Sequence, residues 1–380
     1  MTEQFFSPCP RGLETPLSEE LIALGAEGIH ITDGGVHFRG PGSLSYRVNL
    51  HSRTASRVLW RVAKARYTTE QDIYDTVHAL PWKDWFDETL TIRVNMAAIK
   101  CPLRSLDFAT LKIKDAICDK FREITGERPS VNTHAPDVRI HAFLDELQMS
   151  LYIDTSGDAL FKRGVRQYTN IAPLRENLAA GILILSGWKP GIPLLDPMCG
   201  SGTFLIEAAQ MSLNIAPGIG RHFAFEKLHT FNDDKWQAMR NEAIAAQLPV
   251  TLLPIHGSDL YGDELKAARL NLENAGLLDA VTLKQANVLE VTPPADHGVL
   301  VANLPYGERM GELDEMRILY PQLGDVLKQK FKGWNAYLLT ADLSMPKSIR
   351  LSVSRKTPLF NGALECRLFE YKMVAGSNRK

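Results

Sequence analysis

The sequence has 380 residues, of which 45% are hydrophobic and 23% are charged, and 43 basic and 44 acidic side chains give a net charge of −1. This length allows two or three domains with buried cores, and the composition is ordinary for a globular protein. No apolar run reaches the length of a membrane span, the five cysteines form no C-x-x-C pair, and the first residues lack the apolar core of a signal peptide, so we expect a cytoplasmic protein with no membrane anchor, disulfide framework or metal site.

Residues 1–45 are expected to form a small α/β unit. The periodicity of Leu17–Leu24 predicts a helix with Ser18 as its N-cap. Ile29–Thr32 and Val36–Arg39 are predicted to be strands, and the DGG sequence between them is typical of a hairpin turn.

Residues 46–160 begin with a basic stretch. Between Arg39 and Arg66 there are seven basic residues and no acidic one. A helix over Tyr46–Trp60 would place its arginines on one face, and the lack of acids favours phosphate contact over a merely solvated face. We therefore expect these side chains to bind RNA: Arg53, Arg57, Arg61, Lys64 and Arg66.

The rest of this region is expected to mix strands and helices. Alternation predicts strands at Thr89–Val94, Asp137–Leu144 and Met149–Asp154, the last two as a hairpin. A helix is predicted at Phe108–Thr125, and its basic residues are interleaved with acidic ones. Ion pairs at i,i+4 are therefore a simpler explanation of these basic residues than contact with RNA. An exposed linker is expected over Thr155–Thr169, and its basic residues are further candidates for RNA contact: Lys162, Arg163 and Arg166.

Residues 170–380 alternate strands and helices, which predicts a doubly wound sheet. The connection over Asn214–Pro249 is expected to contain its own helix, and further helices are predicted at Ala172–Ala180, Gly262–Ala275 and Ile318–Phe331. After Leu194 and Leu195, the expected strands are Pro254–Leu260, Val281–Val288, Val299–Ala302 and Trp334–Thr340, with a closing hairpin at Lys356–Phe360 and Glu365–Met373.

The stretch PLLDPMCGSGTFLIEAA at Pro193–Ala209 predicts a strand, a small-residue turn and the start of a helix. Glycines in such a turn let the backbone approach a ligand closely at the carboxyl edge of a sheet. The stretch is not a dinucleotide-binding motif, because Leu205 occupies the position of the third glycine. It is not a P-loop either, because it lacks the lysine that a P-loop requires. At the end of the second strand, Asp259 could accept hydrogen bonds from both hydroxyls of a ribose, or cap the helix that follows.

A second motif, NLPY at Asn303–Tyr306, follows the apolar run VLVA and resembles the N-[LP]-P-[YF] signature of enzymes that methylate exocyclic amino nitrogens. An exocyclic amine is a poor nucleophile because its lone pair is delocalised into the ring. The side-chain oxygen of Asn303 and the carbonyl of Leu304 could accept its two hydrogens and free that lone pair. Pro305 would fix the turn, and Tyr306 could stack on a flipped base. These four residues are therefore the expected catalytic group.

Together these segments resemble the RNA guanine-N2 methyltransferases that carry a THUMP domain, which is an RNA-binding module. The resemblance runs through RGLE, GGVHFRG, IAPLRENLAA, the D-P-x-C-G-S-G-T motif, GSDL and NLPYGER. It implies an α/β fold, in which an N-terminal α+β region precedes a class I (Rossmann-like) methyltransferase domain. The implied domains are a ferredoxin-like unit at 1–45, a THUMP domain at 46–160 and the methyltransferase domain at 170–380.

The same resemblance implies S-adenosylmethionine (SAM) as cofactor and a guanine of large-subunit (23S) rRNA as substrate. Where this family usually has Asp at the third strand, the chain has Asn287, whose amide oxygen can still accept a hydrogen bond from the adenine amino group. Some relatives carry a second methyltransferase domain, which we expect to be absent here. The implied SAM-binding residues are Ala172, Pro173, Asp196, Pro197, Cys199, Gly200, Ser201, Gly202, Thr203, Asp259, Leu260, Asn287 and Val288.

Four alternatives stay open. Related THUMP enzymes methylate guanine N2 in tRNA, and DNA adenine methyltransferases use the same Asn-Pro-Tyr arrangement. A non-catalytic RNA-binding protein is disfavoured by the intact NLPY motif. A cytosine methylase with a cysteine nucleophile is disfavoured because Cys199 lies in the cofactor turn.

Overall fold

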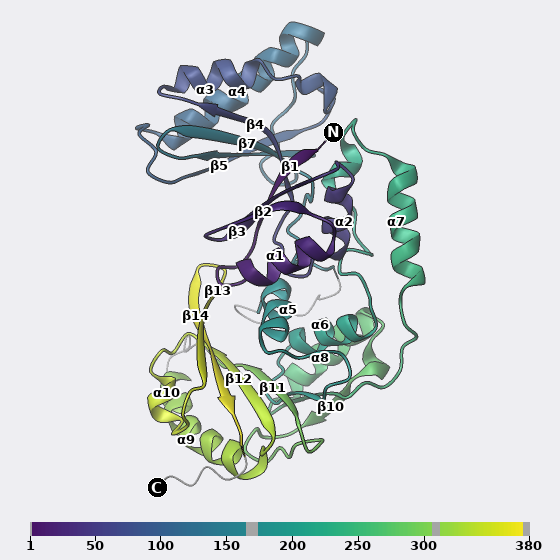
Figure 1. Ribbon diagram of the computed structural model, residues 1–380, viewed down its shortest axis with the longest axis vertical. Coiled ribbons are helices and arrows are strands. Elements are labelled where there is room, and N and C mark those ends of the chain that lie inside the picture. Colours follow the sequence, from purple (N-terminus) through teal and green to yellow (C-terminus); the bar gives the residue numbers. More distant parts are fainter. Residues whose placement is uncertain (1, 165–173, 306–311, 375–380) are drawn as a thin grey trace.

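Two seven-stranded sheets organise the chain in a computed structural model that describes residues 2–164, 174–305 and 312–374. Figure 1 shows the first sheet in the upper half of the molecule and the second in the lower half. The first has the order β2-β3-β1-β4-β7-β6-β5, and all of its strands come from the first 154 residues. Its strands are β1 (Glu3–Pro8), β2 (Glu27–Thr32), β3 (Gly35–Gly40), β4 (Leu59–Arg66), β5 (Ile92–Ala98), β6 (Val138–Leu144) and β7 (Gln148–Asp154).

Helices cover one face of this sheet. Leu17 and Leu21 of the first helix pack with Phe5 and Phe38 in one core, and Ile113 of the longest helix packs with the inner side chains of β6 and β7 in another. Both arrangements follow from alternation in the strands and a 3.6-residue period in the helices. The helices are α1 (Glu14–Ala23), α2 (Leu44–His51), α3 (Glu70–His78) and α4 (Leu106–Thr125).

The second sheet has the order β10-β9-β8-β11-β12-β14-β13. Its first five strands in this order are parallel, while β14 is antiparallel to β12, which confirms the predicted class I methyltransferase architecture. The strands are β8 (Leu194–Asp196), β9 (Ile255–Asp259), β10 (Thr282–Gln285), β11 (Gly298–Asn303), β12 (Trp334–Thr340), β13 (Arg355–Asn361) and β14 (Leu364–Lys372). The helices are α5 (Glu176–Leu185), α6 (Thr203–Ser212), α7 (Asp233–Ala245), α8 (Gly262–Asn274), α9 (Glu312–Lys330) and α10 (Met345–Ser348).

The two halves share one hydrophobic core, which extends from Phe5 in β1 to Leu368 in β14. Helix α5 lies against the N-terminal half so closely that a Cβ on Gly181 would stand 2.4 Å from the Leu13 side chain. Helix α7 lies alongside α2 at the right of the molecule in Figure 1. The N-terminal region and the C-terminal domain are therefore packed together rather than merely tethered.

Several local predictions differ from the structure. Ser18 is not an N-cap, because α1 begins four residues earlier and Ser18 donates instead to the carbonyl of Thr15 at 2.8 Å. The helix expected over Tyr46–Trp60 ends at His51. The start of the predicted linker is packed rather than exposed, since Thr155 and Ser156 are buried. Within the described ranges, no helix is long and apolar enough to cross a membrane.

Candidate active site

The two sequence motifs meet at the carboxyl edge of the second sheet. Strand β8 ends at Asp196 and strand β11 ends at Asn303, and the two strands pair in parallel through Leu194–Val299 and Leu195–Leu300. Strand β9 pairs with the other side of β8 and ends at Asp259. Three polar strand ends therefore lie next to one another, as the doubly wound topology requires.

The turn after β8 depends on two glycines with left-handed backbone. Gly200 has φ +48° and Gly202 has φ +84°, a conformation that side chains with a Cβ rarely adopt. A Cβ on Gly202 would also stand 3.3 Å from the Cβ of Ala268 in α8. The turn is anchored by the Gly202 N–H, which donates to the carbonyl of Cys199, and by the Cys199 N–H, which donates to the carbonyl of Ser258.

Two carboxyl groups frame this turn. Both oxygens of Asp259 accept backbone hydrogen bonds, one from Gly200 N–H at 2.9 Å and one from Tyr261 N–H at 3.0 Å. Asp196 accepts from Met198 N–H at 3.2 Å and is buried. Burial raises the pKa of the Asp196 carboxyl well above its usual range, and the nearby Asp259 raises it further.

This acidic edge fits a cationic ligand. Among the described residues, no Lys, Arg or His forms an ion pair with Asp196 or Asp259, so the edge holds desolvated acidic groups without a protein counter-ion. A ligand that carries positive charge and hydroxyl groups would supply what these carboxyls lack. SAM, which has a sulfonium, an ammonium and a ribose, meets both requirements.

The third strand is shorter than predicted. Strand β10 ends at Gln285, and Asn287 lies in the following turn, where its Oδ1 accepts from Leu289 N–H at 3.0 Å. This local bond ends the strand, while Val288 is buried beyond it and Leu260 is exposed beside Asp259. Roles for Asn287, Val288 and Leu260 in holding adenine remain predictions.

The NLPY motif begins inside the sheet and leaves it. Asn303 pairs with Leu339 in the parallel register of β11 and β12, and Leu304 N–H continues the ladder by donating to the Leu339 carbonyl at 2.9 Å. Leu304 is fully buried and Asn303 is partly exposed. The motif thus presents Asn303 at the same edge as the glycine turn. Four predicted site residues lie outside the described ranges: Arg166, Ala172, Pro173 and Tyr306.

Cys199 has no properties of a nucleophile. Its side chain is buried, and burial raises the pKa of the thiol well above its ordinary value, with Asp196 and Asp259 adding to the shift. Because the thiolate is the reactive form, this cysteine stays protonated and inert. A cysteine-nucleophile mechanism therefore finds no support at this site.

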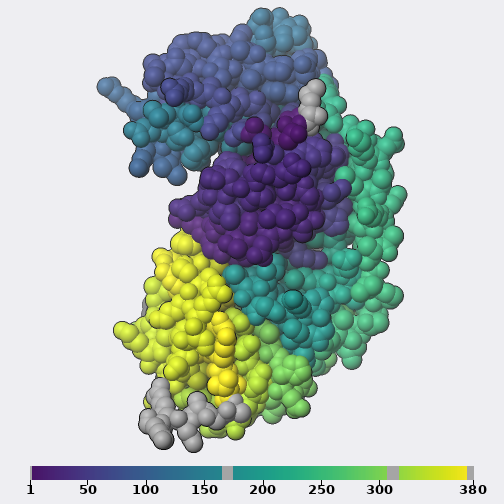
Figure 2. Space-filling view, viewed as in Figure 1, coloured from purple at the N-terminus to yellow at the C-terminus, as the bar shows by residue number. Residues whose placement is uncertain are grey.

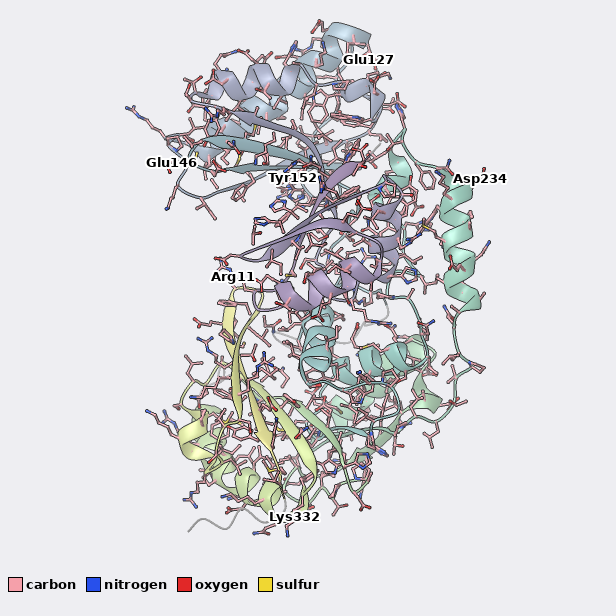
Figure 3. The ribbon with its side chains drawn as sticks, in the orientation of Figure 1. Arg11, Glu127, Glu146, Tyr152, Asp234 and Lys332 are labelled. Atoms are coloured by element: carbon pink, nitrogen blue, oxygen red, sulfur yellow. The ribbon has the colours of Figure 1, made fainter. Side chains whose placement is uncertain are left out.

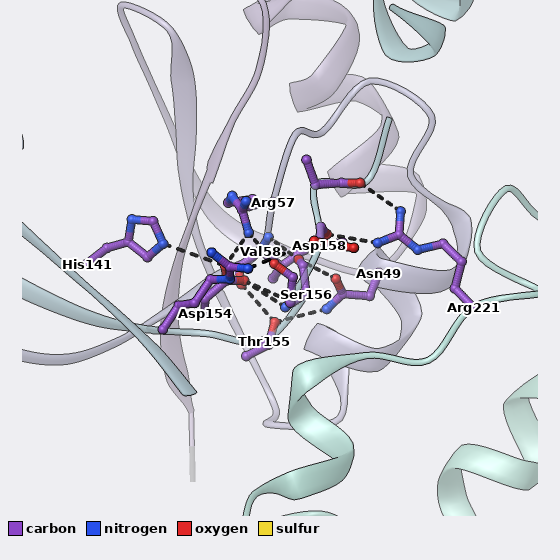
Figure 4. Close-up of polar contacts among 12 residues, drawn as sticks. Asn49, Arg57, Val58, His141, Asp154, Thr155, Ser156, Asp158 and Arg221 are labelled. Carbon is purple, nitrogen blue, oxygen red and sulfur yellow. Dashed lines mark hydrogen bonds and ion pairs between the residues drawn. The ribbon is translucent and has the colours of Figure 1, made fainter. Parts of the chain in front are cut away.

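The arginines expected on one helix face, Arg53, Arg57 and Arg61, do not share a helix. Arg53 and Arg57 lie in an irregular segment, while Arg61 lies on strand β4 together with Lys64 and Arg66. Arg57 donates to Asp154 and to the Gly157 carbonyl, within the polar network that Figure 4 shows around the end of β7. In the same network Arg221 donates to the carbonyl of Asp158.

Arg53 and Arg163 are buried against a glutamate that the sequence did not single out. Glu207, on α6 just after the glycine turn, accepts from Arg163 Nε at 3.0 Å and lies 3.6 Å from Arg53 Nη1. Arg163 also donates to the Arg53 carbonyl at 2.7 Å. The side chains of Arg53, Arg163 and Glu207 are 12%, 2% and 0% exposed. These guanidiniums join the two halves of the molecule, which leaves Lys162, Arg61, Lys64 and Arg66 as the accessible described candidates for RNA contact.

Three known families match successive parts of the chain. Residues 163–370 match the RMKL-like methyltransferase domain, residues 67–154 match the THUMP domain, and residues 4–59 match the ferredoxin-like domain of the RlmL type. A ribosomal RNA large subunit methyltransferase K/L of Shewanella sp. (strain W3-18-1) is 39% identical over 99% of the chain. The chain spans about half of that relative, 54% of its length.

Two further proteins match over nearly their whole length. The slr0064 protein of Synechocystis sp., provisionally named an RNA methyltransferase, is 37% identical, with 98% of this chain and 97% of the relative covered. The crystal structure of SMU.472, a provisionally assigned methyltransferase in complex with S-adenosylhomocysteine (SAH), superposes with a TM-score of 0.88 at 32% identity, covering 100% of this chain and 99% of that one.

Proposed function

This chain belongs to the RMKL-like methyltransferase family, and from that premise we propose that it transfers a methyl group from SAM to the exocyclic N2 of a guanine in large-subunit (23S) rRNA. The observation that carries the proposal is the position of Asn303 at the end of β11, adjacent in the sheet to the acidic strand end and glycine turn of β8. One edge then brings together an amide suited to an amine and carboxyls suited to a cationic cofactor.

The cofactor side of the site would be held by the chain's own backbone and acids. Asp259 already fixes the turn through Gly200 N–H, and its remaining lone pairs can accept from the ribose hydroxyls. Asp196 would face the positively charged end, where a cation lowers the pKa of a desolvated carboxyl. When bound, SAM supplies an electrophilic methyl group on its sulfonium. The SAH complex of SMU.472 supports this assignment.

The substrate side would act by holding hydrogens rather than by removing a proton first. The Asn303 side-chain oxygen and the Leu304 carbonyl are the two acceptors that the amine needs, and the buried Leu304 side chain fixes the backbone that carries them. Such preorganised acceptors favour the developing sp³ nitrogen over the planar ground state. Tyr306, outside the described ranges, completes the proposal as the ring that stacks on the flipped base.

Two observations support RNA as the substrate. The THUMP match covers residues 67–154, and the relatives that match 98–99% of this chain carry names of RNA methyltransferases. An rRNA substrate implies a cytoplasmic enzyme. The guanine N2 target rests on the sequence resemblance, because the NLPY arrangement also suits adenine N6.

The test is a product analysis with the purified chain. Labelled SAM is incubated with large-subunit rRNA, bulk tRNA or duplex DNA, and the nucleosides are separated after digestion. We expect label in N2-methylguanosine from rRNA. Label in N6-methyladenosine would contradict guanine as the target base, and label in DNA would contradict an RNA substrate. Label in tRNA alone would show that the substrate is tRNA rather than rRNA. Asn303→Ala is the matched control for chemistry at this site.

A further inference from the structure

Within the described ranges, no helix packs on one face of the first sheet. Cross-strand partners in a sheet project to the same side, so the register defines this face: Phe6 pairs with His37, His37 with His30, and Arg61 with Tyr152. The alternate residues of the same strands, such as Phe5, Phe38 and Ile153, lie in the cores beneath the helices. We call the outward set the open face, and it consists of His30, His37, Phe6, Arg61, Lys64, Arg66, Tyr152 and their strand neighbours.

Four rings form a row across the open face. The centroids of Phe6 and His37 are 4.6 Å apart, those of His30 and His37 are 6.2 Å apart, and those of Phe6 and Tyr152 are 6.2 Å apart. His30 is exposed, Phe6 and His37 are partly exposed, and Tyr152 is buried. The surface is hollowed here, between the blue upper part and the purple part in Figure 2, and Figure 3 labels Tyr152 beside this hollow.

The charge around this row is positive and uncompensated. Arg61, Lys64 and Arg66 follow one another along β4, and none of them has an ion-pair partner in the part of the chain that the structure describes. Burial lowers the pKa of His37 to about 4, and the nearby Arg61, His30 and Lys64 lower it as well. The acid at the end of β7, Asp154, is itself buried and paired with Arg57.

Helix α4 gives the opposite pattern on the same module. Its Lys114, Lys120 and Arg122 each lie within ion-pair distance of an acid on the same helix. Such pairs are self-contained and need no ligand. The basic residues of β4 therefore differ from ordinary surface charges by their lack of acids and by the rings beside them.

We infer that the open face binds an unpaired segment of the RNA substrate, with bases stacked on Phe6, His37 and His30 and phosphates held by Arg61, Lys64 and Arg66. This inference rests on RNA being the substrate. Bases within a duplex are already stacked on one another, so rings on a flat sheet can contact only bases that are unpaired. Aromatic side chains on a sheet beside a basic groove are a general solution for single strands.

A cycle of two proteins and two strands tests the stacking. Binding of a fluorescent 12-nucleotide oligouridylate to the full chain is measured by fluorescence anisotropy without SAM. The comparison strand has the same length and backbone but lacks its central bases. Phe6→Leu, which keeps an apolar side chain, is expected to weaken binding of the intact strand about fivefold or more and to leave the abasic strand unchanged. Equal affinity of Phe6→Leu and the parent protein for the intact strand would overturn the inference.

Charge is tested separately. Arg61→Gln/Lys64→Gln/Arg66→Gln should flatten the plot of log affinity against log salt by about 0.7 for each phosphate that the variant no longer neutralises. The control Lys114→Gln/Lys120→Gln/Arg122→Gln, at the paired residues of α4, should leave the slope unchanged. A 12-base-pair RNA duplex that binds more tightly than the single strand, or an unchanged slope in the β4 variant, would refute an unpaired segment on this face.

Unfolding midpoints verify that each variant is folded. These assays contain no SAM, so their outcome does not depend on methylation. Absence of methylation by the parent protein would contradict only the proposed function, and absence of a stacking effect would contradict only this inference.

Discussion

The two sheets offer opposite chemistry at the surfaces where ligands would bind. The carboxyl edge of the second sheet gathers Asp196 and Asp259, and in the described residues neither is paired with a cation. The open face of the first sheet gathers Arg61, Lys64 and Arg66, and within the same described ranges none of them is paired with an acid. Each surface lacks the charge that its proposed ligand carries: SAM is cationic and RNA is anionic. On the two proposals made above, cofactor and substrate RNA bind to separate surfaces of opposite charge.

A buried charged cluster lies between the two sheets, in addition to the hydrophobic core that they share. Glu207 extends from α6, directly after the cofactor turn, to Arg163 and Arg53 of the N-terminal side. Glu20 of α1 accepts from the backbone N–H groups of Arg53 and Thr54, at 3.1 Å each, and so fixes the same segment. Charge pairs inside the protein thereby fix the segment around Arg53 relative to the helix that follows the glycine turn.

The largest effect should come from breaking this joint. Glu207→Gln leaves two buried guanidiniums without their carboxylate, and removing one partner of a buried ion pair costs about 3–5 kcal/mol. We expect a clear fall of the urea midpoint for the change at this fully buried position. The matched Glu123→Gln, at a side chain that is 56% exposed on α4, should change the midpoint little. Equal midpoints for the two variants would show that the cluster does not hold the halves together.

Next in size is the chemical step. Asn303→Ala should lose on the order of a hundredfold or more in kcat, by analogy with the deletion of one preorganised hydrogen-bond partner. Its affinities for SAM and RNA should stay within about twofold, because the interaction is made only in the transition state. Single-turnover methyl transfer measures the rate, and a rate equal to that of the parent protein would contradict the role of Asn303.

Loss of a cofactor acid should have a smaller effect. Asp259→Ala removes both the acceptor for ribose and the anchor of Gly200 N–H, and hydrogen bonds to a charged group contribute about 1.5–3 kcal/mol. Calorimetry should therefore give SAM a dissociation constant at least tenfold higher. Unchanged affinity would mean that Asp259 serves only the turn.

The smallest effect concerns pH. His37 has a pKa of about 4 in the fold against an ordinary 6.5, so the unfolded chain takes up a proton that the folded chain does not. Stability should then fall as pH decreases from 6.5 to 4, by about 1 kcal/mol once partial exposure is allowed for. Asp72 and Asp137, with pKa values lowered to about 2, titrate below this window. Urea midpoints of His37→Phe should vary less between pH 7 and pH 4.5, and an identical pH dependence would contradict the assignment.

The second sheet could be predicted from the sequence because its signals are local. A short apolar run followed by Asp-Pro and glycines marks β8 and its turn, and the strand expected at Trp334–Thr340 has those bounds in the structure. The sequence placed Asp196 and Asn303 each at the end of an expected strand, and the parallel pairing of β8 with β11 brings both to one edge, as this edge collects strand ends in a doubly wound sheet. The order of those strands could be predicted from the sequence only in outline. The shortening of β10 did not, because it depends on Asn287 accepting a hydrogen bond within its own turn.

The helix predicted over Tyr46–Trp60 ends early for a tertiary reason. Its apolar residues have helical spacing, but Glu20, more than 30 residues away, accepts from Arg53 and Thr54 N–H groups and draws the chain out of the helix after His51. Likewise, Arg57 pairs with Asp154, which lies 97 positions further along the chain. Arg53 pairs with Glu207, which lies 154 positions further along. Composition showed that these residues lack nearby acids in sequence, and only the fold reveals the acids in space.

The most direct test of separate surfaces measures both affinities on the same three proteins: the parent chain, Asp259→Ala and Arg61→Gln/Lys64→Gln/Arg66→Gln. SAM binding is followed by calorimetry and oligouridylate binding by anisotropy. Our account predicts that Asp259→Ala loses at least tenfold for SAM and less than about twofold for RNA, and that the triple variant shows the reverse pattern. Parallel loss of both ligands in either variant would contradict it.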